Sequence, residues 1–263
     1  MSNDSVMYLL QVLQKYQARD LTNYSVAISQ LKNTLQTWAS SCFIEILNSG
    51  SRAKGTAISL ASDVDYLVSL TNGCNQSNGG LEYTFNQLYQ HLKNKGYQNV
   101  RKQNVSSRIT LNYLEIDITP ATKQPGNTND HSIWKSKNNT WQKTNIQRHI
   151  TDISQSGRTN EIKILKIWRE LNKLDFSSIY LEYLVINNIL LNKSKDVANL
   201  VNNVWYALNE LAKDYGNPLY AGIVDPANSN NILSDLLNQT EKNKIISAAK
   251  IASRQSNWNQ IIW

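Results

Sequence analysis

Cysteine is scarce in this sequence, and its scarcity excludes whole classes of protein. Only Cys42 and Cys74 occur among the 263 residues, and they form neither a Cys-x-x-Cys pair nor a cluster with histidine. A secreted disulfide scaffold or a structural zinc site needs more cysteines at closer spacing. We therefore expect two reduced thiols in a protein of the cytoplasm.

Long apolar runs are also missing, and histidine is rare. A membrane-spanning helix needs about 20 consecutive apolar residues, and no run in the sequence approaches that length. Residues 1–4 carry no basic charge of the kind that opens a signal peptide. The sequence thus predicts a cytoplasmic protein with no membrane segment. The three histidines stand apart from one another and are expected to be structural or exposed rather than metal ligands: His91, His131 and His149.

The charged residues favour one sign. Lysine and arginine number 27 against 20 aspartates and glutamates, so the formal net charge is +7 and the pI is about 9.2. A moderate positive excess suits a polyanionic partner such as a nucleotide or a nucleic acid, although it decides nothing about the fold. The length is enough for one large domain or two smaller ones, each with a core of its own.

Residues 50–68 carry the clearest chemical signal. The stretch opens with a turn of small residues that contains Gly50 and Ser51, and it closes on Asp63 and Asp65 beside an apolar run. If that run is a strand, residues two apart share a face, and both carboxylates point the same way. Two such carboxylates in a partly buried site need a cation between them, and the N–H groups of the turn could hold a phosphate. Carboxylates that bind a metal ion, next to a turn that binds a phosphate, are the groups that metal-assisted phosphoryl or nucleotidyl transfer requires.

A third carboxylate follows on a later β-like run. This run covers residues 108–119, and we expect it to stop at Pro120. Asp117 lies between two isoleucines of the run, so on a strand it faces away from them, as a metal ligand must. Glu115 would share the face of Asp117, and geometry alone does not rank it lower.

The remaining sequence alternates helical and strand-like patterns. Apolar residues recur at helical spacing over residues 8–38, 81–92 and 161–171. The pattern predicts an α/β (α+β) protein in which a small mixed sheet with helices is followed by a helical half. Six tryptophans are expected to pack in the core or between the lobes before any of them serves as a base-stacking platform: Trp134, Trp141, Trp168, Trp205, Trp258 and Trp263.

Taken in order, the functional segments resemble the signature of the polymerase-β-type nucleotidyltransferases. They are Gly50-Ser51, Lys54-Gly55-Thr56, Ser62-Asp63-Val64-Asp65 and Ile116-Asp117-Ile118-Thr119-Pro120-Ala121. More narrowly, they are similar to the branch that holds oligoadenylate synthetases, cyclic GMP-AMP synthase and the bacterial cGAS/DncV-like nucleotidyltransferases, with archaeal-type CCA-adding enzymes as close kin. The resemblance implies a polymerase-β-like catalytic lobe with N-terminal helices over residues 1–140 and a helical nucleotide-binding lobe over residues 141–263.

The same resemblance implies roles for individual residues. Asp63, Asp65 and Asp117 would be the catalytic carboxylates and would hold two Mg²⁺ ions, with Mn²⁺ as a substitute. A further set would bind the nucleotide, chiefly through its triphosphate: Gly50, Ser51, Lys54, Lys166, Ser178, Tyr180, Asp225 and Asn231.

The helical half supplies the later members of that set by resemblance to family motifs. Lys166 lies where relatives carry a lysine that contacts the triphosphate, and Ser178 matches the serine that opens their Ser-x-x-Leu-Glu helix. Some relatives have an aromatic residue directly after that serine, stacked on the base. Here Ile179 follows, so either Tyr180 substitutes for that aromatic residue or base stacking comes from elsewhere in the chain. The last two members belong to a segment similar to the Asp-Pro-Ala…Asn element of oligoadenylate synthetases: Asp225 and Asn231.

Four of these nucleotide-binding assignments have a simpler structural alternative. Lys54 could be a surface lysine, and Lys166 could lie on the polar side of an amphipathic helix. Ser178 could be only a helix N-cap, a role compatible with phosphate contact. Asp225 could be only the residue that opens a turn.

The resemblance implies an enzyme that joins nucleoside triphosphates into cyclic or short linear oligonucleotide second messengers and releases pyrophosphate. Its setting would be bacterial anti-phage signalling of the CBASS type. Nucleoside triphosphates would be its substrates, an RNA or a small molecule could activate it, and an effector protein would respond to its product rather than bind stably. One alternative is an RNA-terminal nucleotidyltransferase of the CCA-adding type. An alternative from another class is a catalytically inactive sensor that binds a nucleotide or RNA.

Overall fold

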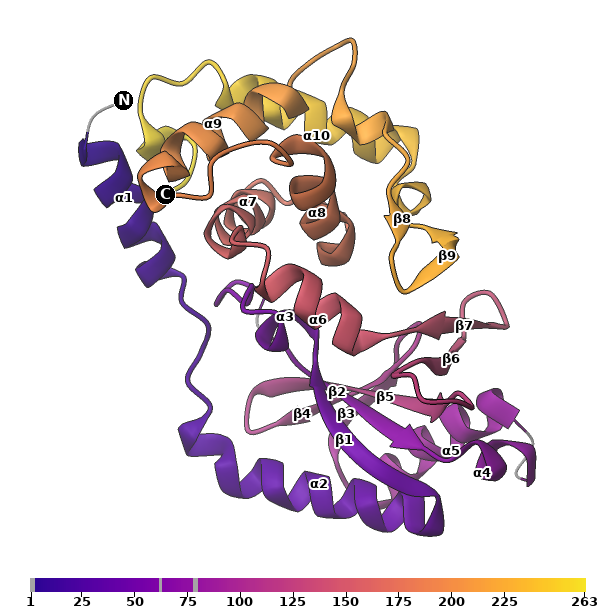
Figure 1. The fold of residues 1–263 in the computed structure, drawn as a ribbon. Coiled ribbons are helices and arrows are strands. Elements are labelled where there is room, and N and C mark those ends of the chain that lie inside the picture. The colour runs from indigo at the N-terminus through magenta and orange to yellow at the C-terminus, as the bar shows by residue number, and fades with distance from the viewer. Residues whose placement is uncertain (1–2, 62, 78–79) are drawn as a thin grey trace. The chain divides into compact units, whose positions relative to one another are not determined.

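The computed structural model describes residues 3–61, 63–77 and 80–263 (Figure 1). They form two compact units. The sheet unit comprises Asp20–Ala53 and Asp63–Ile150, and the helical unit comprises Met1–Arg19, Lys54–Ser62 and Thr151–Trp263. The sequence grouped everything before residue 141 with the sheet. In the structure the first helix belongs to the helical unit instead, because its buried Leu9 and Val12 are part of that unit's core.

Among the described residues, seven strands form the mixed sheet of the sheet unit. The strand order is β1-β2-β5-β4-β3, and β6 pairs with both β5 and β7. Strands β2 and β5 run parallel, and the other pairs are antiparallel. The expected mixed sheet is therefore confirmed. The bounds are β1 (Phe43–Ser49), β2 (Val64–Leu70), β3 (Gln98–Lys102), β4 (Ser107–Leu111), β5 (Leu114–Lys123), β6 (His131–Lys135) and β7 (Thr140–Thr144).

The β-like run at residues 108–119 is a hairpin rather than a single strand. Strand β4 ends at Leu111, and β5 begins at Leu114 and returns antiparallel to it. The two residues between them, Asn112 and Tyr113, both have positive φ angles of 48° and 68°. Two successive residues in this left-handed region are typical of the tightest hairpin turns, whose twist matches that of the strands.

Strand β5 continues through Pro120, so the expected stop at that residue is wrong. Proline lacks an N–H donor and is normally confined to places where the ladder is interrupted. The ladder of β5 is interrupted at this point. On one edge β5 pairs with β4 up to Ile118, and it pairs with β6 only from Ala121 onward. The change of neighbouring strand therefore accommodates Pro120.

Two long helices cover the sheet and make its core. Leu31 and Leu35 of α2 (Ser25–Ala39) and Leu88 and Leu92 of α5 (Gly80–Asn94) are completely buried in one cluster with the strands. Each fully buried leucine stabilises the fold by roughly 1.5–3 kcal/mol. Both helices were expected from their apolar spacing. The sheet unit also holds the short helices α3 (Gly50–Ala53) and α4 (Asn72–Ser77).

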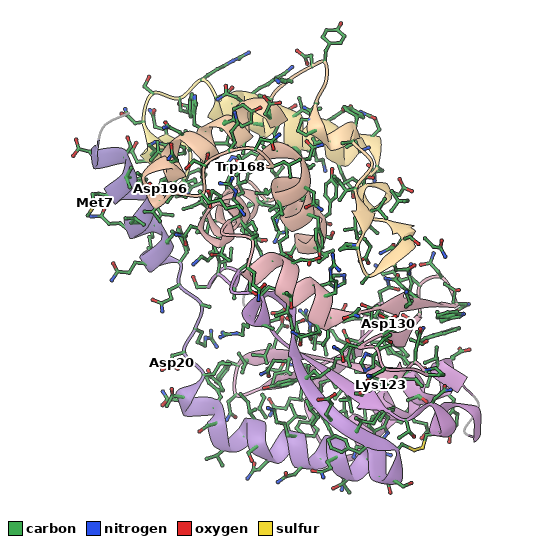
Figure 2. All side chains as sticks on the ribbon, viewed as in Figure 1. Met7, Asp20, Lys123, Asp130, Trp168 and Asp196 are labelled. Atoms are coloured by element: carbon green, nitrogen blue, oxygen red, sulfur yellow. A yellow bond between two sulfur atoms is a disulfide. The ribbon has the colours of Figure 1, made fainter. Side chains whose placement is uncertain are left out.

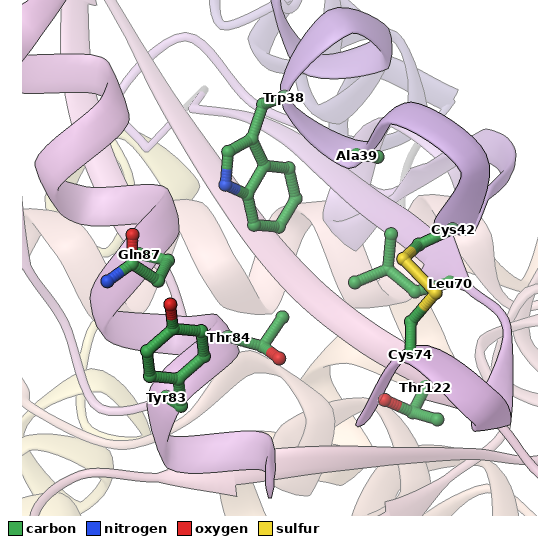
Figure 3. Close-up of a pocket in the computed structure, with 9 residues that line it drawn as sticks. All are labelled: Trp38, Ala39, Cys42, Leu70, Cys74, Tyr83, Thr84, Gln87 and Thr122. Carbon is green, nitrogen blue, oxygen red and sulfur yellow. A yellow bond between two sulfur atoms is a disulfide. The ribbon is translucent and has the colours of Figure 1, made fainter. Parts of the chain in front are cut away.

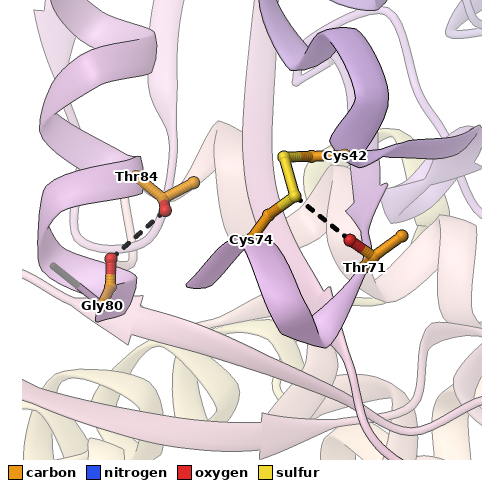
Figure 4. The surroundings of a disulfide bond; sticks show 5 residues. All are labelled: Cys42, Thr71, Cys74, Gly80 and Thr84. Atoms are coloured by element: carbon orange, nitrogen blue, oxygen red, sulfur yellow. Dashed lines mark hydrogen bonds between the residues drawn. A yellow bond between two sulfur atoms is a disulfide. The ribbon is translucent and has the colours of Figure 1, made fainter. Parts of the chain in front are cut away.

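Cys42 and Cys74 form a disulfide, and the expectation of two reduced thiols is wrong (Figure 4). Cys42 directly precedes β1, and Cys74 lies in α4, shortly after β2. Because β1 and β2 run antiparallel with Phe43 opposite Leu70, the strand pairing brings the two cysteines within 5.7 Å, measured between Cα atoms. The hydroxyl of Thr71 donates a hydrogen bond of 3.2 Å to the sulfur of Cys74 (Figure 4).

Replacing Cys42 by serine is expected to lower the free energy of unfolding by about 2–4 kcal/mol, because the disulfide restricts the unfolded chain. Urea denaturation of the wild type and of Cys42→Ser, both without reductant, measures the loss. Adding reductant should lower the free energy of unfolding of the wild type to that of the variant, and it should leave the value for the variant unchanged. Equal stability of the two oxidised proteins would contradict the prediction.

The helical unit is built around α7 (Thr159–Leu171), which confirms the helix expected over residues 161–171. Trp168 of α7 is almost completely buried in the core of this unit (Figure 2). Among the described residues, no helix is both long and apolar enough to cross a membrane. The other elements are α1 (Asn3–Lys15), the end of α6 (Ile146–Ser154), α8 (Ser178–Leu184), α9 (Leu200–Leu211), α10 (Gln239–Ala252) and the hairpin of β8 (Val224–Asp225) with β9 (Asn228–Ile232).

The tryptophans do not all lie in the core. Trp258 is buried and packs edge to face against Trp205, with 6.0 Å between the ring centroids. Trp141 and Trp263 are about half exposed, so these two are not core residues. Trp141 lies on the terminal strand β7, which has a neighbour on one edge only.

Candidate active site

The parallel pairing of β2 with β5 brings the predicted carboxylates to one end of the sheet. Asp65 of β2 lies directly opposite Asp117 of β5, and Asp63 immediately precedes β2. Asp63 and Asp117 both accept a hydrogen bond from one nitrogen, Nη2 of Arg108, at 2.5 and 2.6 Å. Two segments that are far apart in the sequence therefore meet at one cluster of charge. Ser62, part of the expected motif, lies outside the described residues.

Arg108 binds three carboxylates at once. Its Nε donates to one oxygen of Asp117 at 2.7 Å and its Nη2 to the other, which makes a bidentate pair. Its Nη1 donates to Glu115 at 2.7 Å. Glu115 also accepts from Arg101 at 2.7 Å. The planar guanidinium suits this arrangement, because its five N–H donors lie in a fixed fork.

The sequence analysis did not name Arg108, although a signal for it existed. The turn after Leu111 pairs that residue with Leu114, and three pairs further along the hairpin Arg108 faces Asp117. Opposite charges directly across two antiparallel strands attract one another. Treating residues 108–119 as a single strand concealed this pairing.

The electrostatics of the cluster follow from burial and from Arg108. Burial raises the pKa of Asp63, Arg108 opposes that rise, and the nearby carboxylates of Asp117 and Glu115 add to it. The hydrogen bonds to Asp117 raise the pKa of Arg108 further above its ordinary value. The arginine is therefore charged at any ordinary pH, and it is the counter-ion that the clustered carboxylates require.

Gly50 makes room for the carboxylate of Asp65. Its φ is +63°, a conformation that favours glycine. A Cβ at this position would come within 1.8 Å of Oδ2 and 2.3 Å of Cγ of Asp65. No side chain fits at that distance, so the glycine of the Gly-Ser turn is explained by close packing against a candidate metal ligand. Ser51 follows in the first turn of α3 and is half-buried.

A cavity of about 240 Å³ lies beside Asp65 and is also lined by Asn48, Ser49 and Arg52. A second cavity of about 250 Å³ lies next to the disulfide, where Trp38, Tyr83 and Gln87 are among the lining residues (Figure 3). None of the described residues that line the second cavity is acidic. Of these two cavities, the first is the one lined by a predicted carboxylate, Asp65.

The residues present fit a divalent cation in their chemistry. Mg²⁺ and Mn²⁺ take carboxylate oxygens as ligands, and Asp63, Asp65 and Asp117 offer them at one end of the sheet. Within the described part of the chain, however, no group of three or more acidic, histidine or cysteine side chains has the arrangement of a metal site. Asp63 and Asp117 are bound by the guanidinium of Arg108 instead.

The helical unit places two predicted lysines on one buried glutamate. Glu182 of α8 is completely buried; it accepts from Nζ of Lys54 at 2.5 Å and from the hydroxyl of Thr56 at 2.6 Å. Nζ of Lys166 lies 3.5 Å from Glu182. Lys54 is buried as well, so the alternative of a surface lysine is wrong.

The ionisation of this network depends on the balance of burial and charge. Burial disfavours the ionised form of Glu182, but Lys54 and Lys166 outweigh it and hold the pKa of the carboxyl below its ordinary value. Burial lowers the pKa of Lys166 to about 8, although Glu182 opposes that change. Nζ of Lys166 has no hydrogen-bond partner among the described residues. A buried cation with unused donors is suited to an anionic ligand.

Ser178 is the first residue of α8, but Ser177 is the cap. The side chain of Ser177 accepts a hydrogen bond of 3.3 Å from the backbone N–H of Tyr180. The alternative that made Ser178 the N-cap is therefore wrong. The hydroxyl of Ser178 accepts from Arg169 at 3.2 Å, which leaves a basic residue beside the predicted phosphate contact.

The last three predicted nucleotide-binding residues lie in structural positions. Tyr180 is completely buried in the core of the helical unit, so it has no exposed ring face and the prediction of base stacking is wrong for this conformation. Asp225 is buried and accepts from the backbone N–H of Ala227 and from the amide of Asn231, both at 2.9 Å. This pair braces the β8–β9 hairpin, as the turn alternative predicts.

Known proteins resemble this chain in sequence and in fold. A family model for the Second Messenger Oligonucleotide or Dinucleotide Synthetase domain matches residues 7–156. The structure is similar to CdnC of E. coli MS115-1, solved in a CdnC:HORMA-deltaN complex, with a TM-score of 0.73 at 20% identity over 99% of this chain and 98% of that one. The structure is also similar to the Bradyrhizobium diazoefficiens CD-NTase CdnG, solved in complex with GTP. The TM-score is 0.72 at 11% identity, over 94% of this chain and 90% of that one.

A third solved structure has a different activity in its name. The Cid1 poly(U) polymerase with Mg 3′-dATP bound gives a TM-score of 0.65 at 13% identity over 97% of this chain and 96% of that one. No curated protein matches the sequence. At such identities the likeness to solved structures establishes a shared fold.

Proposed function

Since the chain belongs to the Second Messenger Oligonucleotide or Dinucleotide Synthetase family and is therefore a nucleotidyltransferase, we propose that it joins nucleoside triphosphates into cyclic or short linear oligonucleotides. Pyrophosphate would be the second product. The observation that supports this most is the register that sets Asp65 opposite Asp117, with Asp63 bound to the same arginine. By resemblance alone, we extend the proposal to bacterial anti-phage signalling in the cytoplasm.

The proposed site uses Asp63, Asp65 and Asp117 to hold two Mg²⁺ ions, with Mn²⁺ as an alternative. Bound divalent ions supply charge neutralisation on the triphosphate and lower the pKa of the attacking ribose hydroxyl. Gly50 keeps the backbone close to the carboxylate of Asp65, and Ser51 contacts the phosphates. The contribution of the protein is to align the reacting groups and to fix the charges around them.

The experiment that tests the proposal is an incubation of the purified protein with all four nucleoside triphosphates. Chromatography and mass spectrometry identify the products, with Mg²⁺, with Mn²⁺ and with a chelator. We expect short oligonucleotides and pyrophosphate only when a divalent metal is present. Pyrophosphate release without metal would contradict the metal assignment, and its absence under all conditions, with added RNA included, would favour the inactive sensor.

A second candidate function is supported by the Cid1 comparison. That protein is named a poly(U) polymerase, and its TM-score of 0.65 compares with 0.73 and 0.72 for the two Cdn proteins. The fold therefore does not separate the synthesis of free oligonucleotides from addition to RNA, whether of uridine or of the CCA type. Repeating the incubation with and without tRNA separates them, because an RNA-terminal enzyme forms product only when the RNA is present.

Replacing Lys166 by alanine is expected to raise the apparent KM for nucleoside triphosphate by about tenfold, since a hydrogen bond to a charged group is worth roughly 1.5–3 kcal/mol. Its unused donors support this role. Steady-state kinetics measure KM. Lys163→Ala, on the same helix and less buried, is the control and should leave KM within about twofold. An unaltered KM in Lys166→Ala would reduce Lys166 to a structural partner of Glu182.

A further inference from the structure

Arg108 binds the oxygens of two of the three proposed metal ligands, Asp63 and Asp117. Its Nη2 lies 2.5 Å from Asp63 and 2.6 Å from Asp117, and its Nε takes the second oxygen of Asp117 at 2.7 Å. The side chain is only 18% exposed. Both oxygens of Asp117 and one oxygen of Asp63 are therefore occupied by N–H donors of a single cation.

The cluster explains why a cation must be present. Asp63, Asp117 and Glu115 are three carboxylates gathered around one group, and like charges so close together cannot all remain ionised without compensation. Bidentate, charge-assisted hydrogen bonds from arginine are among the strongest that side chains make. Arg108 therefore stabilises the cluster when no divalent ion is bound.

The guanidinium of Arg108 also binds Glu115, which is a carboxylate outside the proposed metal site. Nη1 of Arg108 donates to Glu115, which is 39% exposed and is also bound by Arg101. Glu115 is not among the three proposed metal ligands. The contact with Glu115 can therefore persist while Nε and Nη2 leave Asp117 and Asp63.

We propose that Arg108 is the resident counter-ion of the metal-free site and that it competes with the divalent cation for Asp63 and Asp117. This inference rests on the proposed metal site. Binding of the metal displaces Nε and Nη2 from the aspartate oxygens, and Arg108 stays attached to Glu115. Removing the arginine therefore strengthens metal binding. An arginine that merely positioned the carboxylates for the metal would have the opposite effect, because its loss would weaken metal binding.

The test measures Mn²⁺ binding to the full-length protein without nucleotide, by electron paramagnetic resonance of free Mn²⁺ and by calorimetry. We expect Arg108→Met to bind Mn²⁺ about tenfold more tightly than the wild type, because the metal no longer breaks charge-assisted hydrogen bonds. Without metal, the same variant should melt at a lower temperature than the wild type, and Mn²⁺ should raise its melting temperature by more. Arg101→Met is the matched control, since among the described residues Arg101 pairs with Glu115 and with neither Asp63 nor Asp117, and the Mn²⁺ affinity of this variant should match that of the wild type.

A second variant keeps the test decisive if Arg108→Met does not fold. Arg108→Lys retains the charge but loses the planar fork, and we expect its Mn²⁺ affinity to lie between those of the wild type and Arg108→Met. Equal or weaker binding in the variants, with binding in the wild type intact, overturns the competition and leaves the proposed function standing. Absence of Mn²⁺ binding in the wild type and in both variants overturns the metal site and this inference together.

Discussion

Replacing Asp117 by asparagine is expected to lower nucleotide-joining activity by about a thousandfold or more, because a metal ion contributes several kcal/mol of charge stabilisation to such a reaction. The side chain keeps its size, and Arg108 can still donate to the amide oxygen, so the fold should persist. Product formation from nucleoside triphosphates measures the loss, and circular dichroism checks the fold. Activity at the wild-type level would remove Asp117 from the set of metal ligands.

Glu115→Gln is the comparison that decides which carboxylate of β5 is the ligand. Strand geometry alone left Glu115 and Asp117 unranked, since both lie on one face of the strand, and the family resemblance favoured Asp117. In the structure Asp117 pairs with Asp65 across the sheet, whereas Glu115 is bound by Arg101 and is more exposed. We therefore expect Glu115→Gln to keep activity within about tenfold of the wild type. A loss as large as that of Asp117→Asn would contradict this ranking.

The second large effect concerns stability. Replacing Glu182 by alanine is expected to lower the free energy of unfolding by about 3–5 kcal/mol, because it leaves buried cations without their partner. Lys54 and Lys166 both depend on this carboxylate, and Thr56 also loses its acceptor. Urea denaturation at pH 7 measures the change. If the alanine variant does not fold, Glu182→Gln takes its place. Glutamine retains a hydrogen-bond acceptor, so we expect a smaller decrease in the free energy of unfolding.

Glu210→Ala is the matched control for that measurement. Glu210 pairs with Lys213 at 2.7 Å on the surface of the same unit, and surface pairs of this kind are worth about 0–1 kcal/mol. Similar losses in the two alanine variants would show that burial of Glu182 does not matter.

The pH dependence of the Glu182 variant gives a second readout. In the folded wild type, burial lowers the pKa of Lys166 to about 8, although Glu182 raises it. Without Glu182 the pKa falls further, so folded Lys166 loses its proton at lower pH while the unfolded lysine keeps it. Stability rises with pH wherever the unfolded state binds more protons. The difference in stability between variant and wild type should therefore narrow as the pH rises toward 8.

Several features of the site were predictable because they are encoded in local spacing. The Asp-x-Asp pair at Asp63 and Asp65 follows from the two-residue period of a strand, and the turn at Gly50 follows from its run of small residues, although the close approach of Gly50 to Asp65 does not. The order of these segments, with Asp117 after them, led to the resemblance that the family match confirms. The polymerase-β-like fold and its mixed sheet are confirmed as well.

The features that sequence reasoning missed depend on partners far away in the chain. Arg108 meets Asp63 only because β2 and β4 both flank β5. The Cys42–Cys74 disulfide forms only because β1 and β2 pair antiparallel. The spacing of residues along one element cannot reveal either contact, since the register between elements is what creates them.

By itself, the sequence determined which side chains could do chemistry, because donor type and strand period are local properties of the chain. The tertiary structure alone decided which cation stands among the carboxylates and which glutamate holds Lys54 and Lys166. It also turned Tyr180 into a core residue. The physical reason is that burial and charge pairing depend on the packing of elements from distant parts of the chain. The sequence does not distinguish a glutamate in water from one beside a buried lysine.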